Sequence, residues 1–202
     1  MKLEQRVVIM IDEETWGTRP DAVVTQLAFV AVDLDDPEMI LRQAEVYLPI
    51  QPQLALDRKI DADTIINFWF QQEGAYETHQ MNLGNDMDEL VALVGSIHAK
   101  ITEVIGDADY VEVFSRGSDF DFPIAQSLFD MVGLPQTPWA YNKKYDLRTT
   151  MLEAGISTSD VERPAGLKKH HALSDCKYQL MCLFEARRQM RASKVVHPAA
   201  ES

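Results

Sequence analysis

The chain has 202 residues, 46% of them hydrophobic, which is enough for one globular domain with a sizeable core. Its formal net charge of −13 counts against a protein that coats DNA, because such proteins neutralise phosphates with a basic surface. The charge does not exclude an enzyme that holds a strand end at a metal site, where bound cations supply local positive charge.

Targeting and redox features point to the cytoplasm. No apolar run is long enough to cross a bilayer. The first seven residues lack the apolar stretch and the small-residue cleavage site of a signal peptide. Cys176 and Cys182 fall on different sides of one predicted helix, so we expect two free, reduced thiols.

Three strands are predicted at the start of the chain. Residues 7–11 form a continuous apolar run that stops at Asp12, which is typical of a buried strand. Residues 22–33 and 44–49 are the next two strands, and the acidic cluster at 33–38 is a turn between them. These segments predict an antiparallel opening meander.

The remaining segments predict helices that alternate with one further strand. We expect helices at 61–72, 85–105, 122–132, 146–154 and 172–191, a loop at 73–84, and a strand at 110–114. Gly106 and Gly133 are expected to end the second and third of these helices, with Pro135 beyond the latter. The order predicts a single α/β domain over 1–192, with a central mixed sheet flanked by helices and a disordered tail at 193–202.

Four carboxylates stand at the ends of predicted elements. Asp12 and Glu14 end the first strand and share one face, because side chains alternate along a strand. Asp121 begins a helix after the 110–114 strand, and Asp175 lies near the start of the last helix, five residues after His170. Such oxygen ligands suit Mg²⁺ or Mn²⁺, and two ions ~4 Å apart can clamp a phosphodiester.

Three motifs then give a specific resemblance. Asp12-Glu-Glu-Thr15 matches a D-x-E-T opening, residues 117–121 end in an aromatic-Asp pair, and His170 to Asp175 matches H-x-A-x-x-D. Together and in this order they resemble the DEDDh exonucleases, the DnaQ-like branch of the RNase H-like fold. Residues 11–21 look like a narrower subgroup of phage and bacterial enzymes with a D-x-E-T-x-G-T-x-P opening. The resemblance covers roughly residues 8–186.

This resemblance implies a 3′–5′ exonuclease that uses two Mg²⁺ or Mn²⁺ ions. Asp12 would bridge both ions, Glu14 and Asp175 would each hold one, and Asp121 would position one directly or through water. His170 would accept the proton of the attacking water, since its ordinary pKa of about 6.5 suits a base near neutral pH. The expected substrate is a single-stranded 3′ end, DNA in preference to RNA, and the products are nucleoside 5′-monophosphates. A phage origin and a homodimer are further expectations taken from similar proteins.

Some assignments leave alternatives open. His171 adjoins His170, but the interval to Asp175 favours His170 as the base. Asp119 is close to Asp121, and the Phe-Asp pair favours Asp121 as the ligand. Asp146 can cap its helix, orient Arg148, or support a metal ligand from behind, and a structural or a ligand-supporting role is preferred.

The expected substrate contacts are Thr15, Trp16, Trp69 and Arg148. Trp16 either stacks on the terminal base or packs under the sheet edge. Phe68 is expected in the core and Trp69 on the groove wall. Basic residues near the later motifs can guide the phosphate backbone into an acidic protein: Arg116, Lys143, Lys144, Arg148, Lys168 and Lys169.

Two other functions remain at this point. The first is a non-catalytic module that binds nucleic acid or a partner, against which the intact acids argue. The second is an endonuclease of the ribonuclease H type, which a circular single-stranded substrate distinguishes from an exonuclease.

Overall fold

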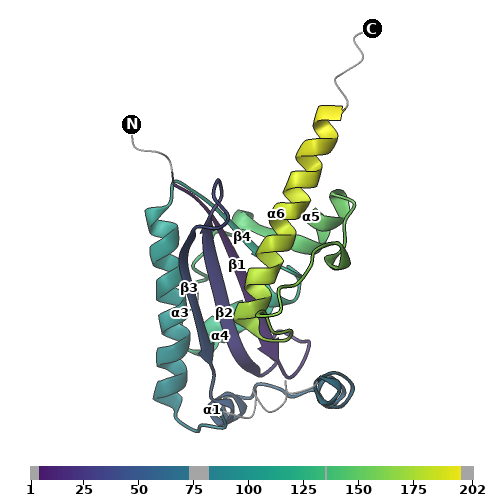
Figure 1. The fold of residues 1–202 in the computed structure, drawn as a ribbon. Coiled ribbons are helices and arrows are strands. Elements are labelled where there is room, and N and C mark those ends of the chain that lie inside the picture. Colours follow the sequence, from purple (N-terminus) through teal and green to yellow (C-terminus); the bar gives the residue numbers. More distant parts are fainter. Residues whose placement is uncertain (1–4, 73–81, 135, 197–202) are drawn as a thin grey trace.

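The computed structural model has one five-stranded mixed sheet, with strand order β3-β2-β1-β4-β5 (Figure 1). It describes residues 5–72, 82–134 and 136–196. The strands β1, β2 and β3 pair antiparallel, whereas β4 and β5 continue the sheet in parallel pairing from β1. The predicted opening meander and mixed sheet are therefore confirmed. The strand bounds are β1 Arg6–Thr15, β2 Val24–Asp33, β3 Ile40–Tyr47, β4 Tyr110–Ser115 and β5 Lys144–Asp146.

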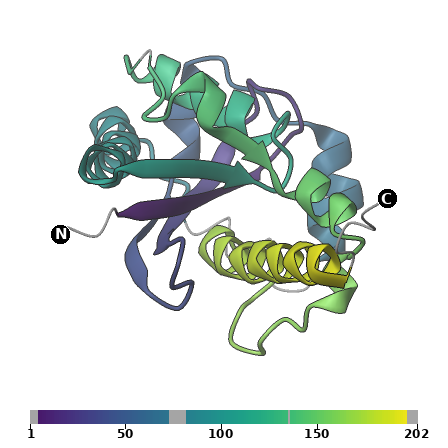
Figure 2. The same cartoon turned by 90° about the horizontal axis from the view of Figure 1, so that it is seen from above.

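Helices cover both faces of the sheet (Figures 1 and 2). One core contains residues of α3 and α4 packed on the sheet, and a second core contains residues of α5 and α6 packed on the opposite face. Both cysteines are free thiols, as predicted, but both are buried in the core under α6, so the expectation that they lie on different sides of the helix is wrong. The helix bounds are α1 Ile50–Ala55, α3 Met87–Asp107, α4 Asp121–Met131, α5 Leu147–Glu153 and α6 Ala172–Val196.

Strand β1 separates these two cores and sets the direction of its acidic side chains. Val8 and Met10 belong to the core under α6, whereas Ile9 and Ile11 belong to the core under α3 and α4. Because side chains alternate along a strand, the even-numbered residues that follow face α6. The apolar run stops at Asp12, but the strand continues to Thr15 and so includes Asp12 and Glu14 near its end, as predicted, because backbone pairing with β2 is unaffected by the polar side chains.

Several predicted boundaries are wrong. Gly106 does not end α3, because it keeps a helical backbone and the helix continues to Asp107. In contrast, Gly133 follows α4 with φ of 81°, as a helix-ending glycine does. The last helix continues to Val196, beyond the predicted start of a tail at 193. The predicted tail beyond 196, most of the predicted 73–84 loop and Pro135 lie outside the described residues.

The segment expected as one α-helix over 61–72 is irregular. It is π-helical over Thr64–Phe68 and 3₁₀-helical over Trp69–Gln71. This change of helix type accompanies the burial of Trp69, whose ring is 1% exposed, while Phe68 stays 38% exposed. The short elements α1 and β5 were not predicted. In the described part of the chain, every helix is too short or too polar to span a membrane.

Candidate metal centre

Three carboxylates from two distant parts of the chain meet at one end of the sheet. Asp12 and Glu14 lie on the α6 face of β1 and are 9% and 6% exposed. Asp175 lies in the first turn of α6, which packs on the same face. One oxygen atom from each of the three lies within 4.8 Å of the other two. The structure thus brings together residues more than half the chain apart, as the motif order predicts.

Asp121 lines the same pocket from the first turn of α4. Its side chain is 4% exposed, and one carboxylate oxygen accepts a hydrogen bond from the Gly117 amide at 3.3 Å. It lies outside the group of three, which fits a ligand that reaches an ion through water or from the side. Asp119 is exposed and does not line the pocket. The pocket therefore contains Asp121 and not its neighbour.

The acids repel one another when no cation is present. Burial raises the pKa of Asp12 well above its ordinary value, and the charges of Glu14, Asp121 and Asp175 raise it further. Burial also raises the pKa of Glu14, again with Asp175 and Asp121 adding to the effect. For Asp121, burial raises the pKa to about 7 although the Gly117 amide opposes the shift. A cluster of buried carboxylate oxygens with excess negative charge is suited to binding a divalent cation.

The two adjacent histidines point to different surroundings. His170 lines the pocket, and its ring contacts Phe68 edge-on with centroids 4.9 Å apart. Burial lowers its pKa from 6.5, although the charge of Asp175 opposes this shift. His171 instead lies by β3, where its Nε2 is 3.0 Å from the Tyr47 hydroxyl and 3.5 Å from a Glu45 carboxylate oxygen. Of the histidines that the structure describes, His170 is the one that lines the pocket and could take part in proton transfer.

Asp175 has a partner on each oxygen. Its Oδ1 accepts a hydrogen bond from Nη2 of Arg163 at 2.6 Å, and its Oδ2 accepts one from the backbone amide of His170 at 3.0 Å. The hydrogen bond from this amide connects Asp175, a candidate metal ligand, to the backbone of His170, the candidate base. His170 has φ of 56°, a left-handed conformation that costs energy in a non-glycine residue. The surrounding contacts therefore hold the backbone of His170 in a conformation that a non-glycine residue rarely adopts.

The pocket has a volume of about 820 Å³ and contains basic as well as acidic side chains. Four cations line it: Arg116, Arg148, Arg163 and Lys169. Arg148 lies so close to Gly117 that a Cβ there would come within 3.2 Å of the guanidinium, so the glycine makes room for it. Three other predicted phosphate contacts do not line the pocket: Lys143, Lys144 and Lys168.

Most of the other predicted substrate contacts are buried. Trp16 is 8% exposed and packs with Trp69 in a small core, so its packing interpretation fits the structure. Trp69 donates from Nε1 to the Thr15 carbonyl at 2.7 Å, and the Thr15 hydroxyl donates to the Gly17 carbonyl at 2.6 Å. The expected order of the aromatic pair is therefore reversed. Phe68 lines the pocket, whereas Trp69 belongs to the core.

Asp146 has a structural role, as the sequence favoured. It caps α5 by accepting hydrogen bonds from the amide and the hydroxyl of Thr149, and it also accepts one from the Ser118 amide at 2.8 Å. These bonds hold the pKa of Asp146 below its ordinary value despite partial burial. They connect α5 to the loop that precedes Asp121.

Sequence reasoning missed three residues of the site. Gln179 is 4% exposed and donates to Oδ1 of Asp12 at 2.6 Å. It follows Asp175 by one helical turn, and this spacing could have placed it on the same face. Glu13 is 4% exposed, and burial raises its pKa well above its ordinary value. Arg163 lies in a loop, and no spacing in the sequence connects it to Asp175.

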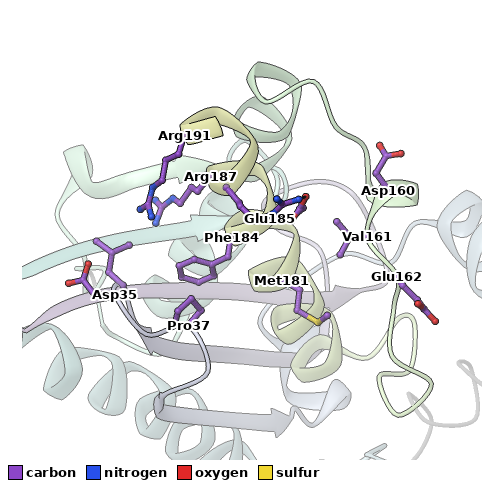
Figure 3. Close-up of a pocket in the computed structure, with 12 residues that line it drawn as sticks. Asp35, Pro37, Asp160, Val161, Glu162, Met181, Phe184, Glu185, Arg187 and Arg191 are labelled. Atoms are coloured by element: carbon purple, nitrogen blue, oxygen red, sulfur yellow. Dashed lines mark hydrogen bonds and ion pairs between the residues drawn. The ribbon is translucent and has the colours of Figure 1, made fainter. Parts of the chain in front are cut away.

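A second pocket of about 810 Å³ lies between the C-terminal half of α6 and the 160–162 segment (Figure 3). It shares Val161 and Glu162 with the acidic pocket but contains none of the predicted site residues. Several of its charged side chains are held in ion pairs: Arg6–Asp35, Arg188–Glu185 and Arg187–Glu112. Among the described residues, the group of three potential metal ligands is Asp12, Glu14 and Asp175, and none of these lines the second pocket.

Comparison with known proteins gives one family and one group of structures. The family model of the Rv2179c-like 3′–5′ exoribonuclease domain matches residues 7–186. No curated protein matches the chain. A zinc-bound E. coli exonuclease I–ssDNA complex has a TM-score of 0.56 at 17% identity, covering 96% of this chain and 43% of that one. The same enzyme with a dT13 oligonucleotide gives 0.57 at 17%, covering 96% and 44%. At this identity the likeness shows the fold, and it confirms the RNase H-like class.

Proposed function

The chain belongs to the Rv2179c-like 3′–5′ exoribonuclease domain family, and we propose that it removes nucleotides from single-stranded 3′ ends with two divalent cations. The observation that carries this proposal is the meeting of Asp12, Glu14 and Asp175 within 4.8 Å, with Asp121 in the same pocket. The chain spans less than half of the exonuclease I chains that it resembles. We propose the complete exonuclease activity for the single domain of residues 1–192.

The chain's own residues have separate tasks in this reaction. Asp12, Glu14 and Asp175 would hold Mg²⁺ or Mn²⁺, with Asp121 positioning one ion. The bound ions would supply Lewis-acid stabilisation of the charge that develops on the phosphodiester. Gln179 fixes the orientation of Asp12 through its hydrogen bond.

His170 accepts a proton from the attacking water in this proposal. Its lowered pKa keeps the ring neutral at pH 7, so that a ring nitrogen is free to take the proton. The edge contact with Phe68 and the bond from its own amide to Asp175 limit the positions of the ring. His171 lacks this role because its ring is engaged with Tyr47 and Glu45.

The substrate is proposed to be a single strand whose phosphates contact the cations of the pocket. Arg116, Arg148 and Lys169 line the pocket, and Phe68 offers a partly exposed ring for stacking on a base. The related exonuclease I structures contain single-stranded DNA, whereas the matching family is described by its action on RNA. The family description supports RNA, and the preference for DNA drawn from the sequence stays a prediction.

The experiment is degradation of matched DNA and RNA oligonucleotides of one sequence, labelled at the 5′ end, with Mg²⁺ and then Mn²⁺. A ladder that shortens from the 3′ end is expected, and a circular single strand should stay intact. Asp12→Asn should bind the strand without cutting it. Cutting of the circle would favour an endonuclease, and binding without cleavage by the wild type in saturating Mn²⁺ would favour a non-catalytic module. Light scattering on the same sample tests the predicted homodimer.

A further inference from the structure

We infer that the guanidinium of Arg163 acts as a fixed positive charge within the metal centre. It holds Asp175 in the metal-free protein, competes with the divalent ion for this carboxylate, and becomes available to a substrate phosphate once the ion is bound. This inference rests on the proposed function, because it assigns Asp175 to the metal. It concerns a residue that the motifs do not contain.

The guanidinium of Arg163 is held in place by several contacts. Its Nη2 lies 2.6 Å from Oδ1 of Asp175, and the two side chains are 16% and 14% exposed. Its central carbon lies 3.9 Å from the ring centroid of Tyr178, over the ring. Its Nη1 donates to the Lys168 carbonyl at 3.3 Å. The Tyr178 hydroxyl in turn donates to the Val161 carbonyl at 2.9 Å. Arg163 therefore occupies a built position and not a chance one on the surface.

This position opposes a divalent ion. The same Asp175 carboxylate supplies the oxygen that lies within 4.8 Å of Asp12 and Glu14, so an ion bound there would be next to the guanidinium. Two cations repel more strongly in a partly desolvated pocket than in water. The charge-assisted hydrogen bond from Arg163 would weaken when the Asp175 carboxylate turned toward a metal. Ion binding and the Arg163–Asp175 pair are thus in competition.

A released Arg163 would face the strand. It lines the same pocket as Arg116, Arg148 and Lys169, and its planar guanidinium can bind two phosphate oxygens at once. Removing its charge should therefore have two effects of opposite sign: tighter binding of the ion and weaker binding of the strand. A residue that merely stabilised the fold would weaken both or neither.

The experiment compares the full chain with Arg163→Gln, Arg163→Met and Arg163→Lys. Mn²⁺ is titrated by calorimetry without nucleic acid, and KM is measured on one oligonucleotide. Loss of one charge-assisted hydrogen bond predicts Mn²⁺ binding tighter by roughly tenfold in Gln and Met, with KM raised by roughly tenfold. Lys restores the charge and should return the Mn²⁺ affinity toward the wild-type value. The matched control is Arg188→Gln, which removes the same charge from an exposed pair with Glu185 and should change neither quantity.

The outcomes separate this inference from the proposed function. Mn²⁺ binding that is unchanged or weaker in the Gln and Met variants overturns the role of Arg163, while a wild type that binds Mn²⁺ and shortens the strand keeps the proposed function. A wild type that binds no Mn²⁺ overturns both. Should the Gln variant fail to fold, as seen by circular dichroism, the Met variant carries the test, because its unbranched side chain can still pack on Tyr178.

Discussion

Replacement of Asp121 by Asn should stabilise the metal-free protein, and the gain should grow as the pH rises. The Asp121 side chain is 4% exposed, and burial raises its pKa from 3.8 to about 7. In the unfolded chain this carboxyl ionises at about pH 4. At neutral pH the wild type must therefore bury a carboxyl group that the unfolded chain keeps ionised in water. An Asn amide has the same shape and no charge to bury.

The sign and size follow from the two pKa values. Because the folded pKa is the higher one, the folded protein keeps a proton that the unfolded chain has lost, and stability falls as the pH rises through the folded pKa. The loss runs from about pH 4 to about pH 7. About 1.5 pH units separate pH 5.5 from the folded pKa, and this interval corresponds to ~2 kcal/mol of unfolding free energy. For a chain of this length, that is roughly 4–8 °C in the unfolding midpoint.

The assay is urea unfolding in EDTA at about pH 5.5 and about pH 8.5. The advantage of Asp121→Asn over the wild type should increase between these conditions by the ~2 kcal/mol derived above. The lowered pKa of His170 acts in the opposite direction, but it is common to both proteins and cancels in the difference. Asp119→Asn is the control, since Asp119 is exposed. An advantage that stays constant with pH, or one that the control reproduces, would refute the reasoning.

Three further predictions concern the base, the ions and the aromatic pair. His170→Ala should lower kcat by roughly 10²–10⁴-fold, as expected for loss of a general base, while His171→Ala keeps most of the activity. Mn²⁺ at about 100 times its Kd should add ~2.7 kcal/mol to the unfolding free energy of the wild type, measured by calorimetry, and less to that of Asp12→Asn. Trp69→Ala should lose roughly 3–5 kcal/mol of stability in urea unfolding. Phe68→Ala should weaken oligonucleotide binding by ~1–3 kcal/mol and leave the unfolding midpoint nearly unchanged.

A specific result would contradict each of these predictions. Loss of activity in the His171 variant alone would move the base to the other histidine. Equal stabilisation by Mn²⁺ of the wild type and the Asp12 variant would place the ion away from β1. A stable Trp69 variant with impaired strand binding would return this ring to the groove wall.

The positions of the four acidic side chains could be predicted from the sequence because each depends on the single strand or helix that carries it. Asp12 and Glu14 share a face wherever residues 12–14 are extended, and β1 is extended there. The apolar run of residues 7–11 requires burial on both faces, which places the strand at the centre of the sheet. The first turns of α4 and α6 carry Asp121 and Asp175, and the predicted starts of these helices were within a residue or so of the observed ones.

The supporting contacts could not be predicted, because they depend on packing between distant segments. Gln179 and Asp12 are 167 positions apart and meet only when α6 lies on the sheet. Arg163 reaches Asp175 from a loop whose path is set by Tyr178. The burial of Trp69 depends on a hydrogen bond to the Thr15 carbonyl, which lies in another element. The periodicity of the sequence describes one helix or strand at a time, whereas each of these contacts joins two separate segments.

The start of α6 explains why two adjacent histidines lie in different surroundings. The Ala172 amide donates to the Gln26 side chain on β2 at 2.9 Å, and His171 is held by β3. The His170 amide donates to Asp175 at 3.0 Å. Three successive residues are thus tied to three different partners, which accounts for the left-handed backbone of His170. With His171 anchored to the sheet, this turn directs the His170 ring into the pocket. Its distance from the acids is then set by the sheet and not by a flexible loop.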